Sequence, residues 1–203
     1  MTKQDRAVRT RAALIGTAAT EFAREGYAGA ALSRISRAAG TSVGALTFHF
    51  DSKADLAAAV VDQAVAAGRV VVDEATAAGG PPLRQLTAVI LGLARKAEAD
   101  AVVRCAARLE RDALGDAEPW RGTWWPTVCR LAHEAHHRGD LPATATPGSI
   151  ADLAALFIRS IGTHTETHAG EPGVAAAGGE SGAARLARLW RITQPGMADR
   201  AGD

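Results

Sequence analysis

The chain has 203 residues, of which 47% are hydrophobic, and its formal net charge is only +1. This length and composition allow one full hydrophobic core, or a small module attached to a larger helical body. No apolar run reaches the roughly 18 residues of a membrane-spanning helix, and two cysteines are too few for a disulfide framework, which excludes membrane-inserted and disulfide-stapled secreted chains. We therefore expect a cytoplasmic protein with reduced Cys105 and Cys129 and no membrane partner.

The N-terminal part of the chain is its basic part. Residues 1–60 hold eight Lys or Arg against five Asp or Glu, a net charge of +3, which leaves −2 for the remainder. Apolar residues at helical spacing predict a first helix that ends at Gly26. They are Leu14, Ile15, Ala18, Ala19 and Phe22. Arg6, Arg9 and Arg11 crowd the start of this helix, as expected of a module that faces DNA.

The stretch LSRISRAAGTSVGALTFHF, residues 32–50, predicts a helix-turn-helix. Gly40 breaks a first apolar run, and Ser42 opens a second short helix whose inner side carries Leu46 and Phe50. The second helix turns small or polar groups outward, which suits a helix that enters a DNA major groove. These residues are Thr41, Ser42, Val43, Gly44, Ala45, Thr47 and His49. An ordinary helical hairpin has the same spacing, so the pattern alone leaves both interpretations open.

The segment DSKADL then restarts a helix. Ser52, with Asp55 three positions later, predicts a capping box in its Asp variant. Lys53 lies in the first turn, where it can meet a phosphate beside the free backbone N–H groups of the helix start. The expected apolar face continues until residues 79–82 end the helix. Its members are Leu56, Val60, Gln63 and Ala67.

In the order GY, LSRISRAAGTSVGALTFHF and SKADLAAAV, residues 8–65 resemble the N-terminal domain of the TetR family of transcriptional repressors. The motif GALTFHFDSKADLA is especially similar to the branch of γ-butyrolactone-type autoregulator receptors. The resemblance implies an all-α fold, with a three-helix helix-turn-helix DNA-binding domain (residues 1–52) and a helical ligand-binding and dimerisation domain (residues 53–203). The chain departs from the family at Ala31, where Ser or Thr is frequent, and at Val43 and Thr47, where Lys and Tyr are frequent.

The resemblance further implies a homodimer that places two recognition helices in successive major grooves of a pseudo-palindromic double-stranded operator. Side chains near the helix starts are expected to contact phosphates. These are Arg6, Arg9, Ser33, Arg34, Thr47 and Lys53. Base edges are expected to meet Thr41, Ser42, Val43, Ala45 and His49, with Gly44 beside them.

The helical body carries the residues expected to bind a small-molecule effector. Gln63 either bonds a neighbouring backbone group or, as the resemblance implies, contacts a ligand. The indoles at Trp120, Trp124 and Trp125 serve core packing or a pocket wall, and the resemblance favours Trp124, then Trp125. Thr163 either bonds back to its own helix or contacts the ligand. The apolar residues expected to complete the pocket are Val89, Leu93, Leu109 and Phe157.

The resemblance implies that the effector is a lactone, butenolide or furan-type signal that releases the protein from its operator and so controls secondary-metabolite genes. An antibiotic or one of its intermediates is the alternative effector for the same fold. The resemblance also implies that two C-terminal helices of each subunit form the dimer interface. The expected interface residues are Ile150, Phe157, Ile161, Leu186, Leu189 and Trp190.

The run HEAHH, residues 133–137, matches the zinc-protease signature HExxH. His133 and His137 point away from the apolar face of their helix, so we expect them in solvent, and no third ligand follows at metzincin spacing. His164 and His168 form a second pair, which leaves a metal sensor or metalloenzyme open as the alternative of another class. No P-loop, dinucleotide fingerprint or G-x-S-x-G motif occurs, and we expect no catalytic residue, metal or cofactor.

Overall fold

The computed structural model describes residues 2–112, 118–142, 144–160 and 181–193, and over these ranges the chain forms helices without a strand. The helices are α1 (Lys3–Gly29), α2 (Leu32–Ala38), α3 (Val43–His49), α4 (Lys53–Ala77), α5 (Pro82–Ala99), α6 (Ala101–Arg111), α7 (Glu118–His137), α8 (Pro147–Arg159) and α9 (Gly182–Thr193). The predicted all-α fold is confirmed. Among the described helices, none is at once long and apolar enough to span a bilayer.

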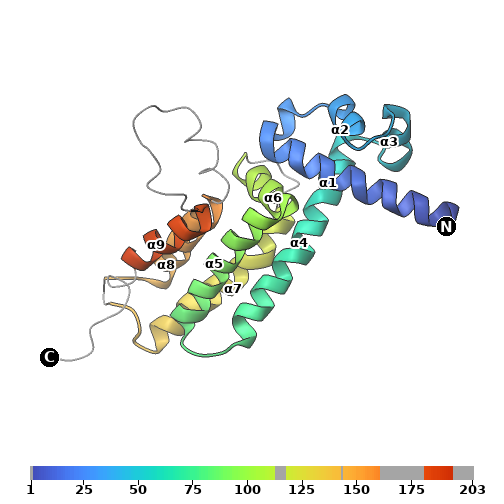
Figure 1. The fold of residues 1–203 in the computed structure, drawn as a ribbon. Coiled ribbons are helices and arrows are strands. Elements are labelled where there is room, and N and C mark those ends of the chain that lie inside the picture. Colours follow the sequence, from blue (N-terminus) through green and yellow to red (C-terminus); the bar gives the residue numbers. More distant parts are fainter. Residues whose placement is uncertain (1, 113–117, 143, 161–180, 194–203) are drawn as a thin grey trace, which may run out of the picture.

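The first three helices form a separate unit at one end of the molecule (Figure 1). The long helix α4 leaves this unit and runs along the body, where it packs on α5, α6 and α7. On the other side of the body, α8 packs on α5, α6 and α7, and α9 packs on α5. The unit is held on the body by contacts of α1 with α4 and α6. One end of the molecule therefore carries the helix-turn-helix, and α4 and α6 of the body support it through α1.

The helix α1 is broken at Gly26, where the sequence predicts its end. Gly26 adopts a φ of 71°, a left-handed conformation that glycine reaches without strain, and the chain then continues to Gly29. Behind the break, the ring of Tyr27 stacks on Phe22 with 5.8 Å between ring centroids. This stacking packs Tyr27 onto the buried face of α1.

The turn between α2 and α3 ends α2 with a Schellman arrangement. Gly40 has a φ of 68°, its N–H donates to the carbonyl of Arg37 at 3.1 Å, and the N–H of Thr41 donates to the carbonyl of Ser36 at 2.9 Å. Ser42 then caps α3 by accepting a hydrogen bond from the N–H of Ala45 at 3.1 Å. Gly40 and Ser42, the residues from which the sequence predicts the turn, therefore form the hydrogen bonds that build it.

The predicted capping box at α4 is confirmed in part. The hydroxyl of Ser52 accepts from the N–H of Asp55 at 3.1 Å, as a capping box requires. The carboxylate of Asp55, however, accepts from the hydroxyl of Ser52 at 2.8 Å rather than from its backbone N–H. The start of α4 is capped on one side only.

Close helix packing in the body depends on two glycines. A Cβ placed on Gly68 of α4 would lie 2.6 Å from the Trp120 ring of α7, and one on Gly92 of α5 would lie 2.6 Å from Val71 of α4. Both distances are far below van der Waals contact. Glycine at these positions lets α4 approach α7 and α5 closely.

The expected inward position of Gln63 is wrong. Its side chain is exposed, and the buried face of α4 instead follows a different set of residues. They are Leu56, Ala57, Ala59, Val60, Val61, Ala64, Gly68 and Val72. From Val60 onward this face advances in steps of four residues, so the step of three that leads to Gln63 leaves the core.

Candidate DNA-binding surface and effector core

The second helix of the helix-turn-helix, α3, turns one side to the core and the other side outward. Leu46 is buried, while Ser42, Val43, Gly44 and Thr47 are exposed. Three more of the predicted DNA-facing residues are half-buried at the edges of this face: Thr41, Ala45 and His49. All seven therefore have atoms at or beside one outer face, and their contacts with base edges stay a prediction.

The most exposed large side chain on α3 is one that the pattern did not single out. Phe48 is 83% exposed, and its ring meets the His49 ring edge-on with 5.4 Å between centroids. A wide aromatic face left in water is unusual for a packed domain and favours a contact surface. Its helical position, opposite Leu46, was a signal in the sequence, but an apolar residue was expected on the inner side.

Several side chains predicted to contact phosphates are already engaged within the protein. The ammonium of Lys53 lies 4.7 Å from the centroid of the Tyr27 ring and donates to the carbonyl of Ala28 at 3.4 Å. The hydroxyl of Thr47 donates to the carbonyl of Gly44 at 3.1 Å. Ser33 is exposed near the start of α2. Arg6 and Arg9 are exposed near the start of α1. The N-terminal end of α1 extends away from the rest of the molecule (Figure 1).

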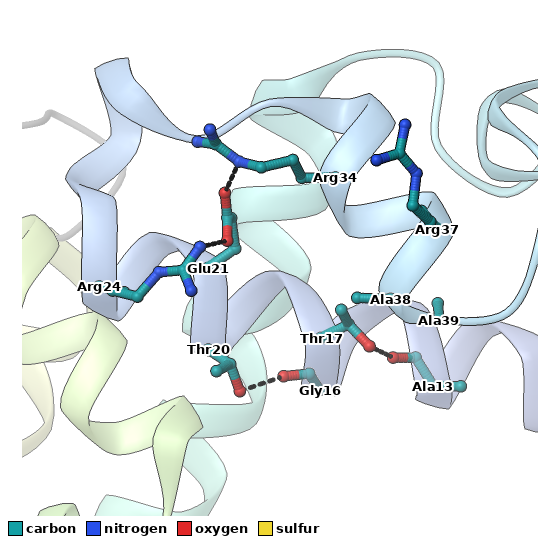
Figure 2. A pocket seen from close by; sticks show the side chains of 10 residues that line it. All are labelled: Ala13, Gly16, Thr17, Thr20, Glu21, Arg24, Arg34, Arg37, Ala38 and Ala39. Carbon is teal, nitrogen blue, oxygen red and sulfur yellow. Dashed lines mark hydrogen bonds and ion pairs between the residues drawn. The ribbon is translucent and has the colours of Figure 1, made fainter.

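Arg34 is the most strongly engaged of the predicted phosphate ligands. Its Nε forms an ion pair with the buried carboxylate of Glu21, and its Nη2 donates to the carbonyl of Gly29 at 2.7 Å. The same carboxylate accepts from Arg24 at 2.8 Å, so Glu21 joins α1 to α2 (Figure 2). Two of its five N–H donors are used in this way, so the main contacts of Arg34 in the DNA-free protein join α2 to α1.

The effector residues predicted in the body lie in its buried core or at the edge of it. Val89, Leu93, Leu109 and Trp124 are buried, and Trp125 and Phe157 are half-buried. The rings of Trp124 and Trp125 meet edge-on with 6.0 Å between centroids. The structure thus brings α5, α6 and α7 together at these residues, while Thr163 lies outside the described residues.

Two indole N–H groups in this core are unsatisfied. Within the described part of the chain, the Nε1 atoms of Trp120 and Trp124 are buried and have no hydrogen-bond partner. By contrast, the equally buried Trp190 donates from Nε1 to the hydroxyl of Thr87 at 2.9 Å. Buried donors without partners are rare in proteins, since each costs about 1–3 kcal/mol. The two free donors mark the core around α7 as a place for a polar acceptor.

The predicted dimer interface needs correction. Ile150, Leu186 and Trp190 are buried within the chain itself, because Trp190 packs on Phe157 and α9 packs on α5. A side chain that is already buried offers no surface to a partner. Leu189 and Phe157 are half-buried, and Ile161 lies outside the described residues. The large apolar side chains exposed on these helices are Leu156 of α8, at 57%, and Ile192 of α9, at 67%.

The histidines form no metal centre in the described part of the chain, where no group of three His, Cys, Asp or Glu side chains is placed to hold an ion. His133 and His137 are exposed, as expected, and Nδ1 of His133 lies 2.8 Å from the carbonyl oxygen of Cys129, one turn earlier. His164 and His168 lie outside the described residues. Both cysteines are free, and burial raises the pKa of the Cys105 thiol to about 12.

Comparison with known proteins gives the same assignment for the N-terminal part and for the whole chain. Residues 14–60 match the model of the bacterial regulatory proteins of the tetR family. The A-factor receptor protein of Streptomyces griseus is 28% identical over 200 residues, which cover 98% of this chain and 67% of that protein.

Solved structures agree with this assignment. A crystal structure of a γ-butyrolactone receptor (ArpA-like protein) superposes with a TM-score of 0.73 at 27% identity, covering 96% of this chain and 90% of that one. The TetR family protein CprB from Streptomyces coelicolor, solved with its operator sequence, gives a TM-score of 0.76 at 29% identity, covering 97% and 92%. Residues 14–60 therefore match the bacterial regulatory proteins of the tetR family, and the chain as a whole is similar in sequence and fold to the A-factor and γ-butyrolactone receptors.

Proposed function

We propose that this chain is a ligand-responsive transcriptional repressor of the bacterial cytoplasm. It binds a pseudo-palindromic operator as a homodimer, with residues 1–52 as the DNA-binding domain and residues 53–203 as the ligand-binding and dimerisation domain. The observation that carries the proposal is the outer face of α3, which exposes Val43, Gly44, Thr47 and Phe48 while Leu46 anchors the helix in the core. A short helix presented in this way fits a DNA major groove.

The exposed face of α8 and α9 supports the homodimer. Leu156 and Ile192 are the large apolar side chains that remain exposed there, and apolar residues in that position are the usual core of a subunit interface. We expect the double variant Leu156→Glu and Ile192→Glu to be monomeric in sedimentation experiments, because two carboxylates would be desolvated at the interface. A dimer that survives both substitutions would place the interface elsewhere.

The effector is proposed to bind where Trp120 and Trp124 leave their N–H groups unsatisfied. A lactone, butenolide or furan-type molecule presents a carbonyl or ring oxygen as acceptor and a mostly apolar body, which matches two indole donors in an apolar core. Because Trp120 and Trp124 are fully buried, we propose that the effector reaches them in an arrangement in which α7 stands further from α4 or α5. It releases DNA only if it binds that arrangement better than the DNA-binding one.

Selection of duplexes from a random library by the purified protein tests the proposal. We expect enrichment of a sequence with two related half-sites, and release of that duplex by a γ-butyrolactone. Trp124→Phe should keep DNA binding and weaken the release, because phenylalanine keeps the ring and removes the donor. If no duplex is enriched at low ionic strength, the repressor assignment fails; if release is unchanged in Trp124→Phe, this residue is not an effector ligand.

A further inference from the structure

A groove of about 730 Å³ separates α1 from α2 on the DNA-binding unit. Small residues and two threonines of α1 line its floor, and the side chains of Arg24, Arg34 and Arg37 stand around it (Figure 2). The hydroxyls of Thr17 and Thr20 donate to carbonyl oxygens of their own helix, so they leave acceptor rather than donor capacity in the groove. The donors that an incoming group would meet belong to the arginines.

One buried carboxylate fixes two of these arginines. Glu21 is only 8% exposed, and it pairs with Arg24 of its own helix and with Arg34 of α2. Arg24 also pairs with Glu25 at 3.0 Å. Three positive charges therefore face two negative ones, and the surplus charge falls at the end of the groove that holds Arg37.

Arg37 is the uncommitted cation of the groove. Its side chain is exposed and makes no hydrogen bond or ion pair with the residues that the structure describes. Arg34, beside it, still has three N–H donors after its bonds to Glu21 and Gly29. The two guanidinium groups therefore offer several donors and one unbalanced charge, which is the chemistry that binds a phosphate.

The position of Arg37 indicates which phosphate it would meet. It lies in the last turn of α2, directly before the Gly40 turn that leads into α3. When α3 occupies a major groove, the anionic groups closest to its flanking helix are the phosphates of the DNA backbone. We propose that the α1–α2 groove is a phosphate-binding site for operator DNA, with Arg37 as the ligand and Glu21 as a positioning residue for Arg34 and Arg24. This inference rests on the proposed function as a DNA-binding protein.

The number of phosphate contacts can be measured from the salt dependence of binding. For a duplex selected from a random library, the slope of log K against log salt should become shallower by about 2 in Arg37→Ala, which is one phosphate contact for each subunit of the dimer, with the base preference unchanged. Arg69→Ala is the matched control, because Arg69 is an exposed arginine of α4 in the body and its loss removes the same charge. An unchanged slope in Arg37→Ala would overturn the assignment of this groove.

Glu21→Gln tests the positioning role by the sign of its effect. If Glu21 only repelled DNA, its neutralisation would strengthen binding; if it positions Arg34 and Arg24, binding weakens and the salt slope also falls. The salt slope separates a positioning role from partial unfolding, because partial unfolding lowers the amount of binding-competent protein and leaves the slope unchanged. Stronger binding by Glu21→Gln, or weaker binding with the wild-type slope, would contradict the positioning role.

Two further outcomes separate this inference from its alternatives. If inorganic phosphate raises the melting temperature of the DNA-free wild type but not of Arg37→Ala, and the salt slope of DNA binding is the same in both proteins, the groove takes a small anion only and the DNA assignment is overturned. If the wild type enriches no duplex at all, the repressor function itself fails. Wild-type binding with a reduced slope in Arg37→Ala supports the groove as a DNA phosphate site.

Discussion

At the scale of single residues, the three fully buried tryptophans provide an internal contrast. The indole N–H of Trp190 donates to the hydroxyl of Thr87, whereas those of Trp120 and Trp124 have no hydrogen-bond partner among the described residues. Burial without a partner costs free energy, and a core kept only for stability gains nothing from it. Between the two alternatives for this cluster, we therefore propose an effector rather than packing alone as the reason for the unsatisfied indoles.

This contrast predicts different effects of the same substitution. Trp190→Phe removes a satisfied hydrogen bond, while Trp124→Phe removes only an unsatisfied donor, and both lose similar ring volume. We expect Trp190→Phe to lower the free energy of unfolding by about 2 kcal/mol more than Trp124→Phe. Denaturant unfolding of the effector-free protein measures the difference, and equal destabilisation would mean that the Trp124 donor has a partner in solution.

Glu110 of α6 predicts a pH dependence. Burial raises the pKa of its carboxyl, against the favourable charges of Arg121 and Arg159, and its Oε2 is buried without a partner in the described ranges. The folded protein thus holds this proton to higher pH than the unfolded chain. The resulting stabilisation is complete below the ordinary value of 4.5 and is lost as pH rises through the raised pKa.

Replacing this carboxyl tests the sign. Glu110→Gln removes the charge that the folded state disfavours, so its melting temperature should exceed that of the wild type at neutral pH. This difference in melting temperature should shrink as the pH is lowered towards 4.5, because the carboxyl of the folded wild type takes up its proton over that range. Thermal melts at several pH values measure this difference, and a constant offset between the two proteins would refute the titration of Glu110 as its cause.

At the scale of elements, the sequence predicts what is local and misses what depends on distant partners. The break at Gly26, the turn at Gly40 and the caps at Ser42 and Ser52 were all predictable, because each is made by residues a few positions apart. The ion pair of Arg34 with Glu21 was not, because it joins two helices.

The errors at Gln63 and at the dimer interface share a physical cause. An apolar stripe shows that a helix face is buried, but it does not show which neighbour buries it. Trp190 is buried by α5 and by Phe157 of its own chain rather than by a partner subunit. After Val60, a step of three residues leads to Gln63 and a step of four leads to Ala64, and both steps are compatible with a helix face. The packing of α5, α6 and α7 on α4 decides that Ala64 is buried and Gln63 is exposed.

The contact of α4 with α7 gives a prediction for helix packing. In Gly68→Ala the new Cβ would lie 2.6 Å from the Trp120 ring, so the helices must separate or the indole must move. We expect a loss of about 1–3 kcal/mol of stability. The matched control is Gly122→Ala on α7, where nothing lies within 4 Å of the new Cβ and alanine should stabilise the helix by about 0.5–1 kcal/mol. Denaturant unfolding compares the two, and equal effects would argue against a tight contact.

At the scale of the whole molecule, the DNA-binding unit and the body are joined by more than the chain. Besides α4, which belongs to both, α6 of the body packs along α1. Arg108 of α6 donates to the carbonyls of Ala23 and Arg24 at 2.8 and 2.9 Å, just before the break at Gly26. The side chain of Arg24 forms an ion pair with Glu21, and Glu21 forms a second ion pair with Arg34 of α2. Polar contacts therefore lead from α6 of the body, through the end of α1, to α2, the helix before the proposed recognition helix.

The last prediction concerns this connection. Arg108 supplies two charge-assisted hydrogen bonds to carbonyls at a helix end, so Arg108→Ala should loosen the end of α1 by about 2 kcal/mol. Amide hydrogen exchange should then quicken in the last turns of α1 and in α2, while exchange in α7 stays unchanged. Arg104→Ala is the control, because Arg104 donates to the carbonyls of Ala97 and Glu98 within the body, at 2.7 and 3.2 Å, and its loss should leave α1 and α2 protected. If Arg108→Ala exchanges like the wild type in α1 and α2, these hydrogen bonds do not hold the end of α1, and the packing of α1 on α4 and α6 carries the link instead.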